Sequence, residues 1–278
     1  MNRERDATIV VNDSAGGHDF AGCWPKFAPD ENGQHLAQMR TQAMFIATNR
    51  EIEKSPEPIL SKSGALVTKR CPLCGTDDGR SAVRGSDARA YFHCPVCRLV
   101  FVDPQHHLSA ADEAARYRLH QNSPEDAGYV AFLRQAIDPM LPRLAPGMRG
   151  LDYGCGPGPT LSILLAAHGL RCDDYDPLFR PIELAPPYDF IFATECVEHF
   201  FRPREEFARL HALLRPGGSL AIMTERWTSL EQLANWYYLG DPTHVVFYHD
   251  QSFDYVCQEF GFARLPSENQ RVTLLERR

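Results

Sequence analysis

The stretch TECVEHFF, residues 194–201, places two carboxylates and an imidazole within five positions. It follows YDFIF, an apolar run that predicts a buried strand, and polar groups at the carboxyl end of such a strand commonly build sites in α/β folds. On a helix, Glu195, Glu198 and His199 would share one face, because they are spaced three and four residues apart. The group could bind a cofactor, hold a metal, or simply open a solvated helix, whose amino end favours acidic residues.

Four cysteines form a second candidate site. Cys71 and Cys74 lie in RCPLCG, Cys94 and Cys97 lie in HCPVCR, and nineteen residues separate the two pairs. Two CxxC knuckles at this spacing favour a tetrahedral thiolate site for zinc, because each tight turn presents two sulfurs to one ion. A module of about 35 residues, 69–104, has too little core to fold unaided, so we expect the zinc to be structural. All four ligand positions are cysteine, which argues against a catalytic role for this ion.

A glycine-rich loop stands between a predicted strand and a predicted helix. The segment LDYGCGPGPTL carries Gly154, Gly156 and Gly158, which let the backbone approach a ligand closely and aim amides at it. Asp152 comes just before the turn, and Asp176, at the end of the next strand, follows Gly158 by eighteen residues. An acid at that place is positioned to accept hydrogen bonds from ribose hydroxyls. The loop therefore predicts a site for a nucleoside-containing cofactor.

Strand and helix patterns alternate from residue 148 onward. RGLDYG, LRCDDYD, YDFIFAT and SLAIMTE predict strands, while TLSILLAAHG, REEFARLHALL and QSFDYVCQEFGF predict helices, and FARLPSEN and RVTLLER predict a closing pair of strands. Such alternation indicates an α/β fold with a doubly wound, mostly parallel, Rossmann-like sheet covered on both faces. Two further helices are predicted upstream, in ADEAARYRLH and GYVAFLRQAI.

Composition limits the classes of protein to which this chain can belong. The chain has 278 residues and a formal charge of −7, which argues against a protein that grips nucleic acid over its whole surface. No segment approaches the ~18 apolar residues of a membrane helix, and the apolar TIVV near the start is too short for a signal peptide, so we expect a cytoplasmic protein without membrane contact. Residues 1–60 are rich in turn and linker residues and predict a flexible N-terminal extension.

Four motifs in order resemble the class I S-adenosylmethionine-dependent methyltransferases. LDYGCGPG is similar to their first motif, YDP to the acidic end of their second strand, YDFIFATECVEHF to their fourth strand and loop, and LLRPGGSLAIMTE to the helix, turn and strand that follow. The resemblance covers residues 112–278 and implies a methyltransferase domain there. It implies that Asp152 and the three glycines line the methionine and ribose side of S-adenosylmethionine, that Asp176 binds the ribose, and that Glu195 lies at the cofactor.

One stretch departs from the family pattern. Only twelve residues, PLFRPIELAPPY, separate Asp176 from Asp189, and four of them are proline. The family usually fits a helix, a strand and another helix there, on the order of 40 residues. We therefore expect a missing or reduced third strand, and no adenine-recognising acid is assigned. Leu178, Phe179 and Ile182 are candidates to sandwich the base, the alternative being a plain Pro-rich connection.

The same resemblance implies a more specific role for the ECVEHF segment. Ubiquinone-pathway O-methyltransferases and small-RNA 2′-O-methyltransferases use a matching Glu-x-x-Glu-His as a divalent metal site, and the RNA enzymes add a later histidine, for which His244 in DPTHVVFY is the candidate. Glu195, Glu198, His199 and His244 would then hold Mg²⁺, Mn²⁺ or a second Zn²⁺. In the metal-free alternative, Glu198, His199 and His244 form a polar catalytic site, with His199 or His244 as general base.

Three functions compete at this stage. The first is methyl transfer to the oxygen or carbon of a small-molecule acceptor, a metabolite or sugar-type compound, since sugar C-methyltransferases are similar in joining a cysteine zinc module to this fold. The second is an RNA methyltransferase that docks RNA on its zinc ribbon; residues 62–108 carry seven Lys or Arg against four Asp or Glu, whereas the total charge is acidic. The third is a non-catalytic scaffold that binds S-adenosylmethionine.

Overall fold

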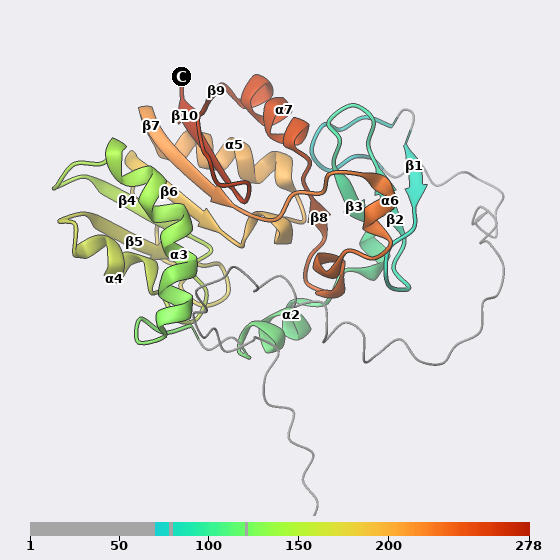
Figure 1. Cartoon of the computed structure of the whole chain (residues 1–278), viewed down its shortest axis with the longest axis horizontal. Coiled ribbons are helices and arrows are strands. Elements are labelled where there is room, and N and C mark those ends of the chain that lie inside the picture. The colour runs from blue at the N-terminus through green and yellow to red at the C-terminus, as the bar shows by residue number, and fades with distance from the viewer. Residues whose placement is uncertain (1–69, 78–79, 120–121) are drawn as a thin grey trace, which may run out of the picture.

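The computed structural model describes residues 70–77, 80–119 and 122–278, so the predicted N-terminal extension 1–60 lies outside the described residues. Two sheets organise these residues, and Figure 1 shows them beside one another. Among the helices of the described ranges, none is both long and apolar enough to cross a membrane.

The larger sheet has six strands in the order β5-β4-β6-β7-β10-β9. The strands are β4 (Arg149–Tyr153), β5 (Arg171–Tyr175), β6 (Tyr188–Thr194), β7 (Leu214–Met223), β9 (Phe262–Leu265) and β10 (Val272–Arg277). β5, β4, β6 and β7 are parallel to their neighbours, whereas β10 is antiparallel to both β7 and β9. This arrangement confirms the predicted mostly parallel, Rossmann-like sheet.

Helices cover both faces of that sheet because its central strands are apolar on both sides. In β6, Phe190 and Phe192 pack toward α3 (Ala127–Met140) and α4 (Leu161–Ala166), while Ile191 and Ala193 belong to the core on the opposite face. That second core includes α5 (Pro203–Leu213) and α7 (Asp250–Phe260). Figure 1 shows α5 and α7 on one side of the sheet and α3 on the other.

The third strand of the family pattern is absent from the described residues between β5 and β6. β5 forms the edge of the sheet, and residues 177–187 cross to β6 as an extended connection with an isolated bridge between Asp176 and Arg180. The short, Pro-rich connection predicted this loss, since twelve residues cannot hold two helices and a strand of ordinary length.

The smaller sheet joins segments that lie far apart in the chain. Its order is β1 (Ser81–Val83), β2 (Tyr91–His93), β3 (Val100–Val102) and β8 (Val246–Phe247), all antiparallel. The sequence predicted a self-contained segment around the cysteines, and β8 was not foreseen. A separate core lies on this sheet, with Tyr91, Val102, Trp227, Tyr238 and Phe247 among its buried members.

Short elements complete the fold. They are η1 (Pro104–His106), α2 (Ala110–Tyr117), η2 (Leu141–Arg143), η3 (Val197–His199), α6 (Leu230–Leu233) and η4 (Tyr237–Gly240). α2 links the two sheets and lies across the carboxyl-terminal side of the parallel strands, and its amino end is capped by the side chain of Ser109. The segments η3, η4 and α2 meet at this edge, where the candidate site lies.

Candidate active site

The glycine loop folds back tightly against the neighbouring strand. The backbone amides of Gly154 and Cys155 both donate to the carbonyl of Tyr175, at 2.8 and 3.1 Å. Gly154 has φ +87°, and a β-carbon on it would meet the β-carbon of Cys196 at 2.6 Å, so this position requires glycine. The loop after β4 is therefore in direct contact with the loop after β6, which carries Glu195 and Cys196.

Asp176 ties the glycine loop to the turn after β5. Its Oδ2 accepts from the amide of Gly156 at 3.1 Å, and its Oδ1 accepts from the amides of Leu178 and Phe179 at 2.8 and 3.0 Å. These three bonds use most of the acceptor capacity of one carboxylate. Leu178 and Ile182, two of the residues predicted to sandwich a base, lie about two-fifths exposed on this connection.

Asp152 is a buried carboxyl, and one of its oxygens has no hydrogen-bond donor among the described residues. Its side chain lies at the centre of the parallel strands with 3% exposure, and within the described residues no group donates to its Oδ1. Burial, together with the neighbouring Asp174 and Asp176, raises the pKa of Asp152 to about 8. An acceptor atom left unpaired beside a glycine loop is suited to a cationic ligand group.

Gly158, the third glycine of the loop, lies close to the backbone of Asn122. A β-carbon on Gly158 would lie 2.5 Å from the carbonyl oxygen of Asn122, in the connection between α2 and α3. The segment before α3 therefore closes over the amino end of α4, which the sequence pattern had not indicated.

Glu195 leaves β6 in a conformation that few non-glycine residues adopt. Its φ is +47°, and its amide donates to the carbonyl of Met223 at the end of β7. Its carboxylate pairs with Arg271 at 3.2 Å, and Arg271 also pairs with Glu225 at 2.9 Å. Arg271, which the sequence analysis did not single out, thus holds the Glu195 carboxylate, whose Oε2 also lies 3.4 Å from the Tyr238 hydroxyl that donates to Glu198.

Glu195, Glu198 and His199 do not share one helix face, as their spacing would allow on an α-helix. Residues 197–199 form the short 3₁₀ helix η3, and Glu195 precedes it with a left-handed backbone. The reason is that the chain must turn sharply after β6 while Cys196 donates its thiol to the carbonyl of Tyr153 at 3.1 Å. Glu198 and His199 therefore reach the site from a tight turn instead of one side of an α-helix.

Glu198 is fully buried and doubly hydrogen-bonded. One carboxylate oxygen accepts from the hydroxyl of Thr224 at 3.0 Å and the other from the hydroxyl of Tyr238. Burial raises the pKa of Glu198, and the two hydroxyl donors partly offset this rise. A buried carboxylate held in this way has a defined orientation toward its neighbours.

Two imidazoles meet at Glu198 in matching tautomers. His199 Nδ1 lies 3.0 Å from the carbonyl of Thr243, and His244 Nδ1 lies 2.8 Å from the carbonyl of Tyr238. Because a carbonyl can only accept, each Nδ1 carries the proton and each Nε2 keeps a lone pair. The two ring centroids are 4.8 Å apart, and burial lowers the pKa of both imidazoles, that of His244 to about 3.

These three side chains form a donor set that a divalent metal could occupy. One ligand atom from each of Glu198, His199 and His244 lies within 4.8 Å of the other two. Imidazoles whose other nitrogen donates to a backbone carbonyl are the usual form of metal-binding histidines. One carboxylate and two neutral imidazoles suit Mn²⁺, Zn²⁺ or Mg²⁺ and leave coordination positions open.

α2 brings a second carboxyl to the same place. The hydroxyl of Tyr117 donates to Oε1 of Glu113 at 2.9 Å, and the Tyr117 ring meets His199 edge-on at 5.3 Å. Glu113 is buried, and that burial raises its pKa. Arg116 of the same helix pairs with Asp241 at 3.2 Å. The helical pattern of ADEAARY predicted the helix, but no local signal placed it over His199.

A family model described as a methyltransferase domain matches residues 119–266, more than half of the chain and the whole of the glycine loop and ECVEHF. The chain belongs to this methyltransferase family. The match confirms the predicted enzyme class, a methyltransferase dependent on S-adenosylmethionine.

No curated protein matches this methyltransferase in sequence. Among solved structures, it is similar to a 1,6-didemethyltoxoflavin-N1-methyltransferase of Burkholderia thailandensis, with 18% identity, a TM-score of 0.44, and coverage of 71% of this chain and 99% of the other. It is also similar to the magnesium protoporphyrin IX methyltransferase of Synechocystis, with 14% identity, a TM-score of 0.43, and coverage of 61% and 95%.

The cysteine knuckles of the methyltransferase gather four sulfurs. The Sγ atoms of Cys71 and Cys97 lie 3.5 Å apart, and those of Cys74 and Cys94 lie 3.4 Å apart. Zn–S bonds of about 2.3 Å in a tetrahedron would space the sulfurs about 3.8 Å apart, so the donor set fits zinc. Each knuckle ends in a left-handed residue, Gly75 at φ +76° and Arg98 at φ +58°.

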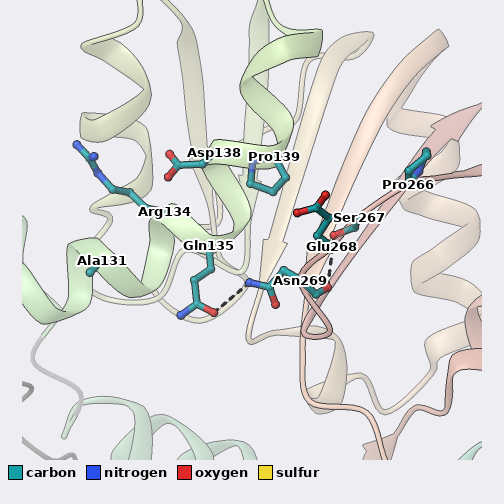
Figure 2. Close-up of a pocket in the computed structure, with 9 residues that line it drawn as sticks. All are labelled: Ala131, Arg134, Gln135, Asp138, Pro139, Pro266, Ser267, Glu268 and Asn269. Carbon is teal, nitrogen blue, oxygen red and sulfur yellow. Dashed lines mark hydrogen bonds between the residues drawn. The ribbon is translucent and has the colours of Figure 1, made fainter. Parts of the chain in front are cut away.

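Two hollows of the methyltransferase lie away from this site. A groove of about 640 Å³ runs between α3 and the β9–β10 loop, and Figure 2 shows Gln135 and Asn269 hydrogen-bonded across it. A cavity of about 180 Å³ lies between the smaller sheet and Phe200 and Phe201. Neither is lined by Asp152, Glu198, His199 or His244, although Phe200 and Val245 of the second cavity follow His199 and His244 directly in the chain.

Proposed function

We propose that the protein transfers the methyl group of S-adenosylmethionine to an oxygen or carbon of a small-molecule acceptor, a metabolite or sugar-type compound. The observation that carries this proposal is the cluster of Glu198, His199 and His244, whose ligand atoms lie within 4.8 Å of one another while each imidazole Nδ1 is engaged by a backbone carbonyl. Such a cluster can receive and activate an acidic hydroxyl or carbon acid next to the cofactor.

The residues around the glycine loop fit the cofactor. Asp152 offers an unpaired, buried carboxylate oxygen that would receive the ammonium group or face the sulfonium centre. A β-carbon on Gly156 would meet no atom within 4 Å, so this side of the loop is open to a ligand. Asp176 keeps residual acceptor capacity for a ribose hydroxyl. When bound, S-adenosylmethionine supplies an electrophilic methyl group, and the protein's work is to align the acceptor with it.

On the acceptor side, the convergence of three ligand atoms within 4.8 Å favours a divalent cation over a free histidine base. Glu198, His199 and His244 would hold the ion, which would lower the pKa of an acceptor hydroxyl bound to it. Tyr238 and Thr224 hold the carboxylate, while the carbonyls of Tyr238 and Thr243 hold the imidazoles. Glu195 stays with Arg271 and is left out of this ligand set.

Burial of the site supports a small acceptor over RNA. Glu198 and His244 are buried, and the Tyr117 ring of α2 lies edge-on against His199, so a nucleic-acid strand would have to displace these side chains to reach them. Two of the arginines in the cysteine segment are also taken up by contacts within the fold. The side chains of Arg80 and Arg89 are only 8% and 10% exposed, and both take part in ion pairs with aspartates.

Zinc is assigned to the four cysteines as a structural ion. The three backbone bonds Cys71 N to Thr76 O, Gly75 N to Cys71 O and Cys94 N to Leu99 O close the two knuckles around the sulfurs. Strands of three residues and a two-residue β8 bury little apolar area by themselves, so the metal would supply much of the stability of this sheet.

The experiment is a calorimetric titration with S-adenosylhomocysteine, followed by transfer of a labelled methyl group to a panel of hydroxylated and enolic acceptors, with and without added Mn²⁺. The proposal expects micromolar binding and turnover that depends on the divalent ion. Binding with turnover that is unaffected by chelation would leave His199 as the base and remove the ion. Turnover on RNA alone, or no binding, would overturn the proposal.

A further inference from the structure

Arg89 lies between the two cysteine knuckles, just before β2, and its side chain points into the loop at residues 239–244. Its guanidinium donates to four backbone carbonyls of that loop. The acceptors are Leu239, Asp241 at 3.2 Å, Pro242 at 3.3 Å and His244 at 2.9 Å. A planar fork with donors on two nitrogens can bind several carbonyls at once, which a lysine ammonium cannot reproduce.

The guanidinium is itself held in place. Its Nε donates to Oδ2 of Asp87 at 2.7 Å, and the hydroxyl of Tyr91 donates to Oδ1 of the same carboxylate at 2.9 Å. The guanidinium also lies over the Tyr91 ring, 5.4 Å from its centroid. Tyr91 is buried in the core of the smaller sheet, so the position of Arg89 depends on that sheet.

The loop at residues 239–244, which Arg89 holds, carries backbone carbonyls and a histidine that matter for the orientation of the two imidazoles. The loop carries His244 itself and the Thr243 carbonyl, which accepts the Nδ1 proton of His199. It begins next to Tyr238, whose carbonyl accepts the Nδ1 proton of His244. The following residue, Val245, donates to the carbonyl of Glu198 at 2.9 Å and accepts from the amide of Val102 in β3. A shift of this loop would therefore move His244 and, with the Thr243 carbonyl, the acceptor that orients His199.

We propose that Arg89 is a positioning residue of the acceptor site, through which the segment between the cysteine knuckles fixes the Nδ1–H tautomers of His199 and His244. The catalytic meaning of this assignment rests on the proposed function, but the structural claim does not. On this view the cysteine segment is part of the active site's framework, and its role extends beyond anchoring the chain.

The test compares Arg89→Ala and Arg89→Lys with Arg84→Ala, an exposed arginine on the same segment that serves as the matched control. Each protein is labelled with ¹⁵N-histidine, and the ring nitrogens of His199 and His244 are assigned with His199→Gln and His244→Gln. The readouts are the tautomer of each ring and the protection of each Nδ1 proton from exchange, alongside zinc content and affinity for S-adenosylhomocysteine.

In the wild type and in the Arg84→Ala control, the rings of His199 and His244 are both expected to be protonated at Nδ1. In Arg89→Ala, both rings become tautomer mixtures and lose roughly tenfold in protection, the factor that one hydrogen bond of ordinary strength gives. Zinc content and cofactor affinity stay within about threefold, because none of the groups that Arg89 bonds is a zinc-type cysteine or belongs to the glycine loop.

Either of two results would overturn the proposal. One is wild-type tautomers in a folded Arg89→Ala protein. The other, should Arg89→Ala fail to bind zinc, is wild-type tautomers in Arg89→Lys. A wild type that fails to bind S-adenosylhomocysteine would count against the proposed function alone, since the histidine signals are read without cofactor or acceptor.

Discussion

Asp152→Asn should have opposite effects on stability and on cofactor affinity. Asp152 is buried among the parallel strands, faced by Asp174, Asp176, Tyr129 and the thiols of Cys155 and Cys172. Its pKa of about 8 in the folded protein compares with 3.8 for the ordinary group. Between these values the folded state binds a proton that the unfolded chain has released. Folding stability is therefore lost as the pH rises from about 4 to about 8.

The size of this loss follows from the shift. Each unit of pKa corresponds to about 1.4 kcal/mol, so the wild type should lose on the order of 4 kcal/mol through this one group between pH 4 and pH 7. The asparagine does not titrate, although its buried amide costs about 1–3 kcal/mol if left without partners. The variant should therefore be slightly less stable than the wild type at pH 4.5 and more stable, by roughly 2–3 kcal/mol, at pH 8.

Urea unfolding followed by circular dichroism at four pH values between 4.5 and 8 measures this difference, with Asp138→Asn, an exposed carboxyl on α3, as the control. Affinity for S-adenosylmethionine, measured at pH 8, should fall about tenfold or more, because the cation loses a buried charged partner. Stability curves of wild type and variant that run parallel over this range would refute the reasoning about Asp152.

Three further predictions concern single residues. Glu198→Gln should weaken Mn²⁺ binding, measured by electron paramagnetic resonance, about 100-fold or more, because the ion loses its only charged ligand in the cluster; unchanged Mn²⁺ affinity would remove the ion from the proposal. Cys94→Ser should lose the zinc measured by atomic absorption and lower the melting temperature; a zinc-free variant with the wild-type melting temperature would show that the ion does not stabilise the fold. Asp176→Ala should reduce affinity for S-adenosylhomocysteine at least about tenfold in calorimetry, because three backbone amides lose their acceptor. An Asp176→Ala protein with wild-type affinity would separate this carboxylate from the cofactor.

Local pattern predicted the larger sheet well. The alternation of YDFIFAT and SLAIMTE with helical segments predicted the parallel strands. The glycine loop lies, as predicted, between the strand β4 and the helix α4. These features succeed because each is encoded within a few neighbouring residues: apolar runs, helix periodicity, and glycines where φ is positive, as at Gly154 and Gly156. The short, Pro-rich stretch before Tyr188 likewise predicted that the third strand of the family pattern is missing.

Long-range partners escaped prediction. Nothing near VVFY indicates that β8 pairs with β3, and nothing near Arg271 indicates an ion pair with Glu195. Glu195, Glu198 and His199 do not share the face that their spacing would give them on a helix, because the contact of Cys196 with Tyr153, far away in the chain, outweighs the local spacing of acids. Glu113 and Arg89 lie in unremarkable segments, and only the tertiary fold brings them to the histidines.

The pairing of β3 with β8 has a consequence for how the chain is made. Roughly 145 residues separate Phe101 from its partner Val246, so the open edge of β3 has no strand to pair with until most of the protein has left the ribosome. An unpaired edge of buried valine and phenylalanine is a template for association with other chains. A fragment ending near residue 110 should therefore aggregate even with zinc present. Transplanting the cysteine segment onto another domain would require carrying the late strand β8 with it.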